Sequence, residues 1–207
     1  MNLRAALLSI AVLPFVAHAE PAPDRATANA HFQAADARVK ETAATLEAAS
    51  KAFRGCRNGA LQFQFTDALG RLEKSRRALE KGRKGAQAFR HSLEATRAKL
   101  EASHSKRNAP TRQEAVANEQ VYAERLAAEY VAPLDGVLVP LIDGYTVGMN
   151  AYSAALNRYA EFCAKPGYTA AGGAAFVAGM EPELVALTTA SSLLATAAGQ
   201  GHALSAK

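Results

Sequence analysis

The sequence is poor in cysteine and in the residues that favour β-strands. Its 207 residues include two cysteines and no tryptophan, and 7% of them are aromatic. β-Branched and aromatic residues, which strands prefer, are sparse, whereas alanine, the strongest helix former, supplies roughly a quarter of the chain. The composition therefore predicts an all-α fold.

Motifs that would carry catalysis or hold a cofactor are also missing. No serine lies in a Gly-x-Ser-x-Gly elbow, and the sequence contains neither a phosphate-binding glycine loop nor a Cys-x-x-Cys-His haem motif. Glu101-x-x-His104 supplies one half of the Glu-x-x-His pair that a di-iron bundle needs, but residues 111–163 contain no histidine for the other half. We therefore predict a protein that is not an enzyme and has no metal site and no cofactor.

No apolar run near the N-terminus is long enough to span a membrane. The run at 5–16 has about 12 residues, against the roughly 20 that a span needs. It follows a single cation, Arg4, and precedes the small-x-small pattern at 17–19. We expect a signal peptide (1–19) that is cleaved after Ala19, with an uncleaved anchor as the alternative. The protein is then expected to be periplasmic or secreted.

The remaining chain is predicted to form one domain. Residues 20–198 are enough for one sizeable core, and we expect a single helical domain there, followed by a flexible tail at 199–207. Glu181-Pro182-Glu183 interrupts the apolar C-terminal region, so no integral membrane span is expected.

Apolar residues recur in steps of three and four along four stretches, as one face of a helix requires. The predicted helices run from about 26 to 53, 60 to 105, 111 to 163 and from 181 onward. Thr111 followed by Glu114 is typical of a capping box at the start of the third helix. Pro133 and Pro140 lie inside that helix and remove backbone donors, so a kink or short break is expected between 131 and 144.

The two cysteines indicate how these helices are connected. From the turn near Asn108, Cys56 lies 108 − 56 = 52 residues back and Cys163 lies 163 − 108 = 55 residues on. An antiparallel hairpin therefore brings them together at its open end, and export favours their oxidation to a disulfide. The predicted fold is an elongated helical bundle built on this long antiparallel helical hairpin, with one flanking helix at each end.

Residues 71–105 repeat every seven residues. The three regular columns are Leu72, Leu79, Ala86, Leu93 and Leu100; Glu73, Glu80, Gln87, Glu94 and Glu101; and Arg76, Arg83, Arg90, Arg97 and His104. In a helix the leucine column, together with a column of mostly small residues, forms an a/d-like seam. The glutamate column lies three residues before the arginine column, at the spacing where opposite charges meet.

This repeat has two interpretations. Residues 71–107 carry a net charge of +8 (twelve Lys or Arg, four Glu), and residues 108–163 carry −4 (three Arg, seven Asp or Glu). If the acidic segment folds back and answers part of the basic charge, the repeat is a charge-patterned structural helix. The alternative is a basic face that recruits an anionic partner. Its candidate binding residues are Arg76, Arg83, Arg90 and Arg97.

The tyrosines Tyr145, Tyr152 and Tyr159 also recur every seven residues. At this spacing they share one helix face, and the first interpretation is that they pack in the core with their hydroxyls at its rim. The alternative is an aromatic groove that binds a partner helix or an apolar ligand. All three are therefore candidate binding residues.

Together these features favour a function in binding. We expect an exported, non-enzymatic protein that binds another protein in the bacterial envelope, with an acidic protein as one option. It would act as an inhibitor or immunity protein, a chaperone or an assembly factor. One alternative is a binder of anionic envelope polymers or lipids through residues 71–107, and another is a bundle that binds a small molecule or cofactor. Nucleic acid is not expected as a partner, because the basic helix lacks interleaved aromatic residues. The oligomeric state is left open.

Reduction of the protein tests the predicted disulfide. A Cys56–Cys163 bond would close a loop of 163 − 56 = 107 residues, which contributes about 4 to 5 kcal/mol in the chain-entropy model. We expect a reducing agent to lower the melting temperature of the wild type but not that of a Cys56→Ser, Cys163→Ser variant. Equal melting temperatures of the oxidised and reduced wild type would exclude the bond.

Overall fold

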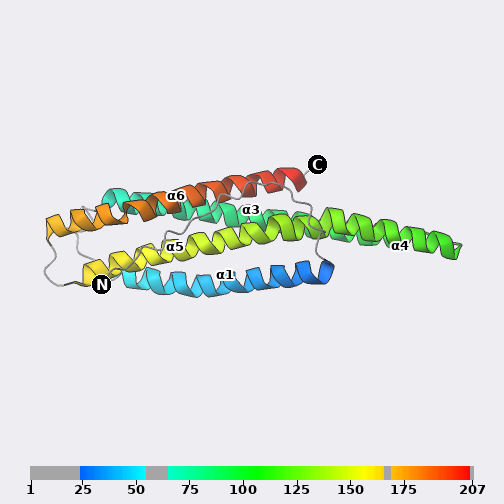
Figure 1. The fold of residues 1–207 in the computed structure, drawn as a ribbon, viewed down its shortest axis with the longest axis horizontal. Helices are drawn as coiled ribbons and strands as arrows, with labels where there is room; N and C mark the ends of the chain where they lie inside the picture. The colour runs from blue at the N-terminus through cyan, green and yellow to red at the C-terminus, as the bar shows by residue number, and fades with distance from the viewer. Residues whose placement is uncertain (1–23, 55–64, 166–168, 206–207) are drawn as a thin grey trace.

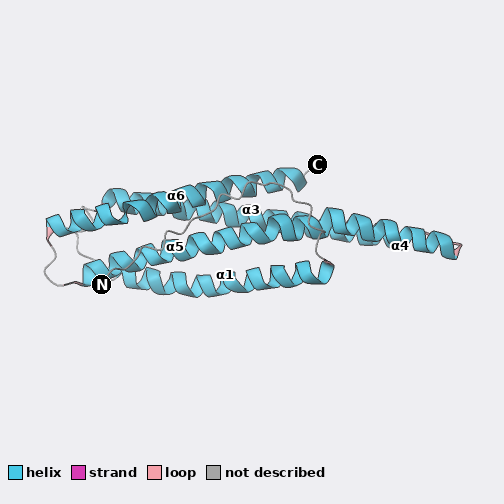
Figure 2. Ribbon diagram, in the orientation of Figure 1, coloured by secondary structure: helices cyan, strands magenta, loops and turns pink. Residues whose placement is uncertain are grey.

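The structure is a computed structural model that describes residues 24–54, 65–165 and 169–205. Its elements are α1 (Arg25–Arg54), α3 (Thr66–Ser105), α4 (Arg112–Leu126), the π-helical segments η1 (Ala127–Val131) and η2 (Leu134–Leu138), α5 (Val139–Ala164) and α6 (Ala170–Ser205). These ranges contain no strand (Figure 2), which confirms the predicted all-α class. None of their helices has the length and apolarity that crossing a membrane requires.

The helices form an elongated bundle (Figure 1). Helix α3 runs to a turn at 106–111, and α4, η1, η2 and α5 return alongside it as one continuous helical stretch. Helix α1 packs along α5 in the same direction, and α6 packs along α3 while also contacting α5. This arrangement is compatible with the predicted hairpin and flanking helices. The turn lies beyond the ends of both α1 and α6 in Figure 1.

One face of α1 is buried, as its periodicity predicts. The fully buried positions recur every seven residues and are small: Ala28, Ala35, Thr42 and Ala49. Larger residues beside them, Phe32, Val39, Leu46 and Phe53, are partly buried against the core. Small side chains in the centre of the face let α1 approach α5 closely, while the larger ones fill its edges.

The capping box at the start of α4 is confirmed. The backbone N–H of Glu114 donates to Thr111 Oγ1 (3.2 Å), and the backbone N–H of Thr111 donates to Glu114 Oε2 (3.1 Å). Two backbone donors that the helix itself cannot pair are therefore satisfied. The box ends the turn sharply and starts the return helix.

Of the kink or short break expected between 131 and 144, the break does not occur, because the chain stays helical through both prolines. The α-helical pattern is nevertheless interrupted just before and within this range. Two π-helical segments accommodate the prolines: the N–H of Ala132 donates to the carbonyl of Ala127, and the N–H of Val139 donates to that of Leu134. Each bond reaches five residues back instead of four. Such a wider turn re-pairs backbone groups around a residue that lacks an N–H, so the helix continues.

The start of the last helix was also predicted wrongly, because α6 begins at Ala170 and not near Glu181. Thr169 caps it: the N–H of Gly172 donates to Thr169 Oγ1 (3.1 Å), and the N–H of Gly173 donates to the Thr169 carbonyl (2.9 Å). A threonine cap satisfies donors that the first turn leaves free, so the glycines that follow do not prevent the helix. Helix α6 extends to Ser205, beyond the start of the predicted tail.

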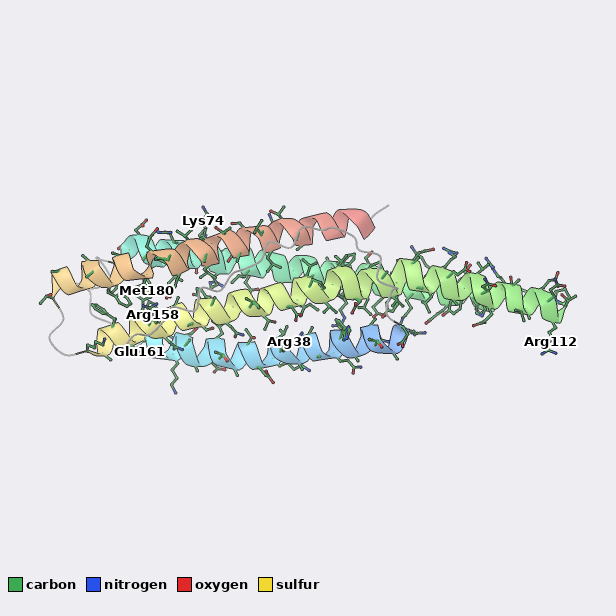
Figure 3. The ribbon with its side chains drawn as sticks, viewed as in Figure 1. Arg38, Lys74, Arg112, Arg158, Glu161 and Met180 are labelled. Atoms are coloured by element: carbon green, nitrogen blue, oxygen red, sulfur yellow. The ribbon has the colours of Figure 1, made fainter. Side chains whose placement is uncertain are left out.

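Ion pairs between helices lie on the surface of the bundle. Arg38 of α1 pairs with Asp143 of α5 (2.5 Å), and Arg158 of α5 pairs with Glu183 of α6. Arg38 and Arg158 are labelled in Figure 3. Exposed pairs of this kind contribute about 0 to 1 kcal/mol each, so their main effect is on the register of the helices.

Glycines allow α6 to pack closely on the hairpin. A Cβ atom added at Gly82 of α3 would lie 2.7 Å from Leu194 Cγ, and one at Gly144 of α5 would lie 3.2 Å from Leu194 Cδ1. The side chain of Leu194 therefore occupies space that α3 and α5 both leave free. A Cβ atom at Gly85 would lie 2.7 Å from Ala198 Cβ. Ala198 has no rotamer to change, so α6 itself would have to move.

Substitution of these glycines tests the packing of α6. In an open helix position, Gly→Ala stabilises by up to about 1 kcal/mol. We expect this gain for Gly70→Ala, since nothing lies within 4 Å of the added atom. Gly85→Ala is expected to destabilise by about 1 to 3 kcal/mol, because overpacking displaces α6. Denaturant titration followed by circular dichroism measures both; equal stability of the two variants would contradict the close packing.

Candidate functional site

The leucine column of the repeat is the buried face of α3. Its members Leu72, Leu79, Ala86, Leu93 and Leu100 are at most 5% exposed. In the adjacent column Ala68, Ser75, Gly82 and Phe89 are also buried. This face packs on α5 and α6, so the seam holds the bundle together and is not available to a partner.

Three of the four candidate arginines pair with glutamates of their own helix. The pairs are Arg76 with Glu73 (2.8 Å), Arg83 with Glu80 (2.9 Å) and Arg97 with Glu94 (2.9 Å). Hydrogen bonds from Arg76 and Arg77 hold the pKa of Glu73 at about 2, below its usual value. The spacing of three residues that the sequence shows is therefore used for pairing within α3.

The fourth candidate, Arg90, follows Gln87, which interrupts the glutamate column. Without a carboxylate three residues earlier, its guanidinium lies over the ring of Phe32 in α1, 4.7 Å from the ring centroid. A cation–π contact of this kind contributes about 0.5 to 1 kcal/mol at an exposed site. All four arginines thus have intramolecular partners, and binding another molecule through them would compete with these contacts.

The three candidate tyrosines lie in the core. Tyr145 and Tyr152 are nearly fully buried, and Tyr159 is 0% exposed. Burial raises the pKa of all three phenols, that of Tyr159 to about 12. A groove lined by these residues would require the helices to separate.

Tyr159 is the centre of an aromatic cluster that joins four segments of the chain. Its ring makes edge-to-face contacts with Phe53 of α1 (6.5 Å between centroids), Phe65 before α3 (5.2 Å) and Phe176 of α6 (5.2 Å). Phe162 of α5 stacks on Phe176 (4.4 Å). Local sequence patterns do not reveal this cluster, because most of its members are far apart in the chain and they share no common spacing. Among the residues that the structure describes, the buried Tyr159 hydroxyl has no hydrogen-bond partner.

The predicted disulfide stays a prediction. Cys56 lies outside the residues that the structure describes. Cys163 is at the end of α5, partly buried against the core.

The hairpin ends in a projecting segment, residues 101–125, which we call the arm. It extends beyond α1 and α6 (Figure 1), and Figure 3 places Arg112 at its outer end. None of its residues is buried. Its two helices meet through few contacts: the rings of His104 and Tyr122 stack 4.4 Å apart, and His104 Nε2 lies 3.1 Å from Glu119 Oε2.

The lysines of α3 differ from its arginines. Lys74, Lys81 and Lys84 are exposed, and within the described ranges none of them forms an ion pair. We call these three residues the lysine face. The sequence does not single them out, because they lie outside the three regular columns. Only the pairing of the arginines in the structure shows which cations have no ion-pair partner. Separately, the described part of the chain contains no group of three or more His, Cys, Asp or Glu side chains that could hold a metal ion.

Replacement of Tyr159 tests whether it has only a packing role. Because its buried hydroxyl is unpaired, Tyr159→Phe is expected to stabilise the protein by about 1 kcal/mol. In the wild type the raised pKa means that the neutral phenol contributes fully to folding stability below pH 10. This contribution is lost as the pH rises towards 12. As the pH rises from 8 to about 12, the denaturation midpoint of Tyr159→Phe should therefore fall less steeply than that of the wild type.

The control is Tyr122→Phe in the arm, which should leave the steep alkaline loss unchanged. Destabilisation by Tyr159→Phe would show that the hydroxyl has a partner or function that the packing does not reveal.

Comparison with known proteins adds no assignment. No protein-family model matches the chain, and neither a curated protein nor a solved structure does. Any function must therefore be argued from the surfaces described above.

Proposed function

We propose that the protein is an exported, non-enzymatic helical protein of the bacterial envelope that binds another protein through the arm. Inhibitor, immunity protein, chaperone and assembly factor are roles that share this step. The predicted signal peptide supports the location, and the predicted disulfide suits an oxidising compartment. The observation that carries the proposal is a projecting pair of helices that contains no buried residue.

The arm is not needed to complete the bundle. The last buried residue of α3 is Leu100, and the only buried residue of α4 is Leu126. Between them 25 residues, 101–125, are ordered as helix and turn without a buried side chain. Ordering a residue costs about 1 to 2 kcal/mol of backbone entropy. The arm buries little surface, so it contributes little to folding stability. Contact with a second molecule explains its presence better.

The arm is nevertheless built as a defined shape. The capping box fixes the start of α4, and Arg107 Nη1 donates to Asn118 Oδ1 across the turn (3.3 Å). Helix α4 has 15 residues, so it extends roughly 22 Å at 1.5 Å per residue. Such a pair of helices presents a preformed surface, which lowers the entropy that binding must overcome.

The surface of the arm suits contact with a protein. Val116 is 62% exposed, more than any other large hydrophobic side chain in the described chain, and Val121 is exposed nearby. Residues 101–125 contain four Lys or Arg and four Glu, so their formal net charge is zero. The partner of the arm is then selected by apolar contact and shape more than by charge.

Removal of the arm separates its binding role from folding. Replacing residues 101–125 with a short glycine-containing turn joins Leu100 to Leu126, a connection length usual between antiparallel helices. The shortened protein is expected to stay helical and to melt within a few degrees of the wild type, because no buried residue is lost. It should no longer co-purify with the partner of the full-length chain.

A photo-crosslinking residue placed at Val116 identifies that partner in producing cells. We expect one discrete adduct with another protein, and none from the same residue at the exposed Ala44 of α1. Equal adducts at both positions, or a partner that the shortened protein retains, would overturn the proposal.

A further inference from the structure

We infer that the lysine face, Lys74, Lys81 and Lys84 of α3, binds the anionic phosphate headgroups of a membrane surface. This is a second surface, separate from the arm, and it does not depend on the proposed protein partner. Figure 3 places Lys74 at the edge of the bundle on the side away from α1. Lys81 and Lys84 are exposed as well.

The lysine face is a compact line of charge. At 100° and 1.5 Å per residue, the three lysines lie within about 80° of one another around α3 and within about 15 Å along it. Arg77 lies between them on the same side and is 76% exposed. A flat anionic surface could contact the whole line without any movement of the helices.

No carboxylate of α3 neutralises these lysines. The nearest glutamates on the helix are Glu73 and Glu80. Glu73 accepts hydrogen bonds from both Arg76 and Arg77, and Glu80 accepts one from Arg83. The acids of the repeat are thus engaged by arginines, and the lysine charge is left for solvent or a ligand.

The use of lysine and not arginine favours a diffuse anionic surface. Arginine binds carboxylates in a fixed, forked geometry, whereas lysine is a hydrated point charge on a flexible stem. Within α3 the arginines make the directed contacts, and the lysines make none. A specific acidic protein partner would be expected to use arginine, which is enriched at binding hot spots.

An exposed apolar side chain lies on α6 near its contact with α3. Thr188 of α6 lies against α3, with its Oγ1 3.3 Å from Ser75 Oγ. Val185 lies three residues earlier on the same side of α6 and is 49% exposed. Cations edged by an aliphatic group are typical of surfaces that lie in the membrane interface. The use of lysine and the nearby exposed aliphatic side chain both point to phospholipid as the ligand.

Vesicle binding tests this inference on the full chain. We expect the wild type to sediment with vesicles that contain about one third phosphatidylglycerol but not with pure phosphatidylcholine, and binding should weaken as salt rises. Lys74→Glu, Lys81→Glu, Lys84→Glu should lower the partition coefficient by on the order of 100-fold.

The matched control is Lys51→Glu, Lys99→Glu, Lys165→Glu, which changes the net charge equally at exposed positions outside the lysine face and the arm. It should lose far less binding, while circular dichroism shows both variants folded. An equal loss in the two variants would show that only net charge matters. Absence of wild-type binding to the anionic vesicles, or capture of an acidic protein that the lysine variant loses, would also overturn the inference. The arm-less variant should still bind vesicles, so failure here and failure of the proposed protein binding are distinguishable.

Discussion

Helix α3 buries one face against α5 and α6, and the other contacts of the bundle are arranged around that burial. Its leucines and small residues pack on α5 and α6, its glycines admit Leu194 and Ala198 of α6, and Arg90 reaches Phe32 of α1. Burial of this kind scales with the apolar area removed from water. The ion pairs on the rim then set register, because exposed pairs add little free energy.

The charged residues of α3 divide into two groups with different surroundings. Arginines beside the seam are held by carboxylates or by an aromatic ring, which leaves their alkyl stems over the core edge. Lysines on the outer side have no such contacts. Much of the basic charge of α3 is therefore paired within the molecule. The unpaired cations on its outer side are fewer than the net charge of +8 over residues 71–107 indicates.

Local patterns in the sequence predicted the features that depend on neighbours along the chain. The buried face of α1, the capping box at Thr111 and the leucine seam follow from spacings of three, four and seven residues. Features that depend on distant contacts could not be read this way. Helical continuity through Pro133 needs a π-helical register, the Tyr159 cluster joins residues without common spacing, and the lysine face emerges only after the arginines are paired.

The arm has a consequence for how this architecture can vary. Since residues 101–125 contain no buried residue, adding seven residues to each helix of the arm would restore the same helix faces and move the tip outward by roughly 10 Å. The reach of the protein from its body can thus increase in steps without any change in the core. Reach and core packing are independent variables in this chain.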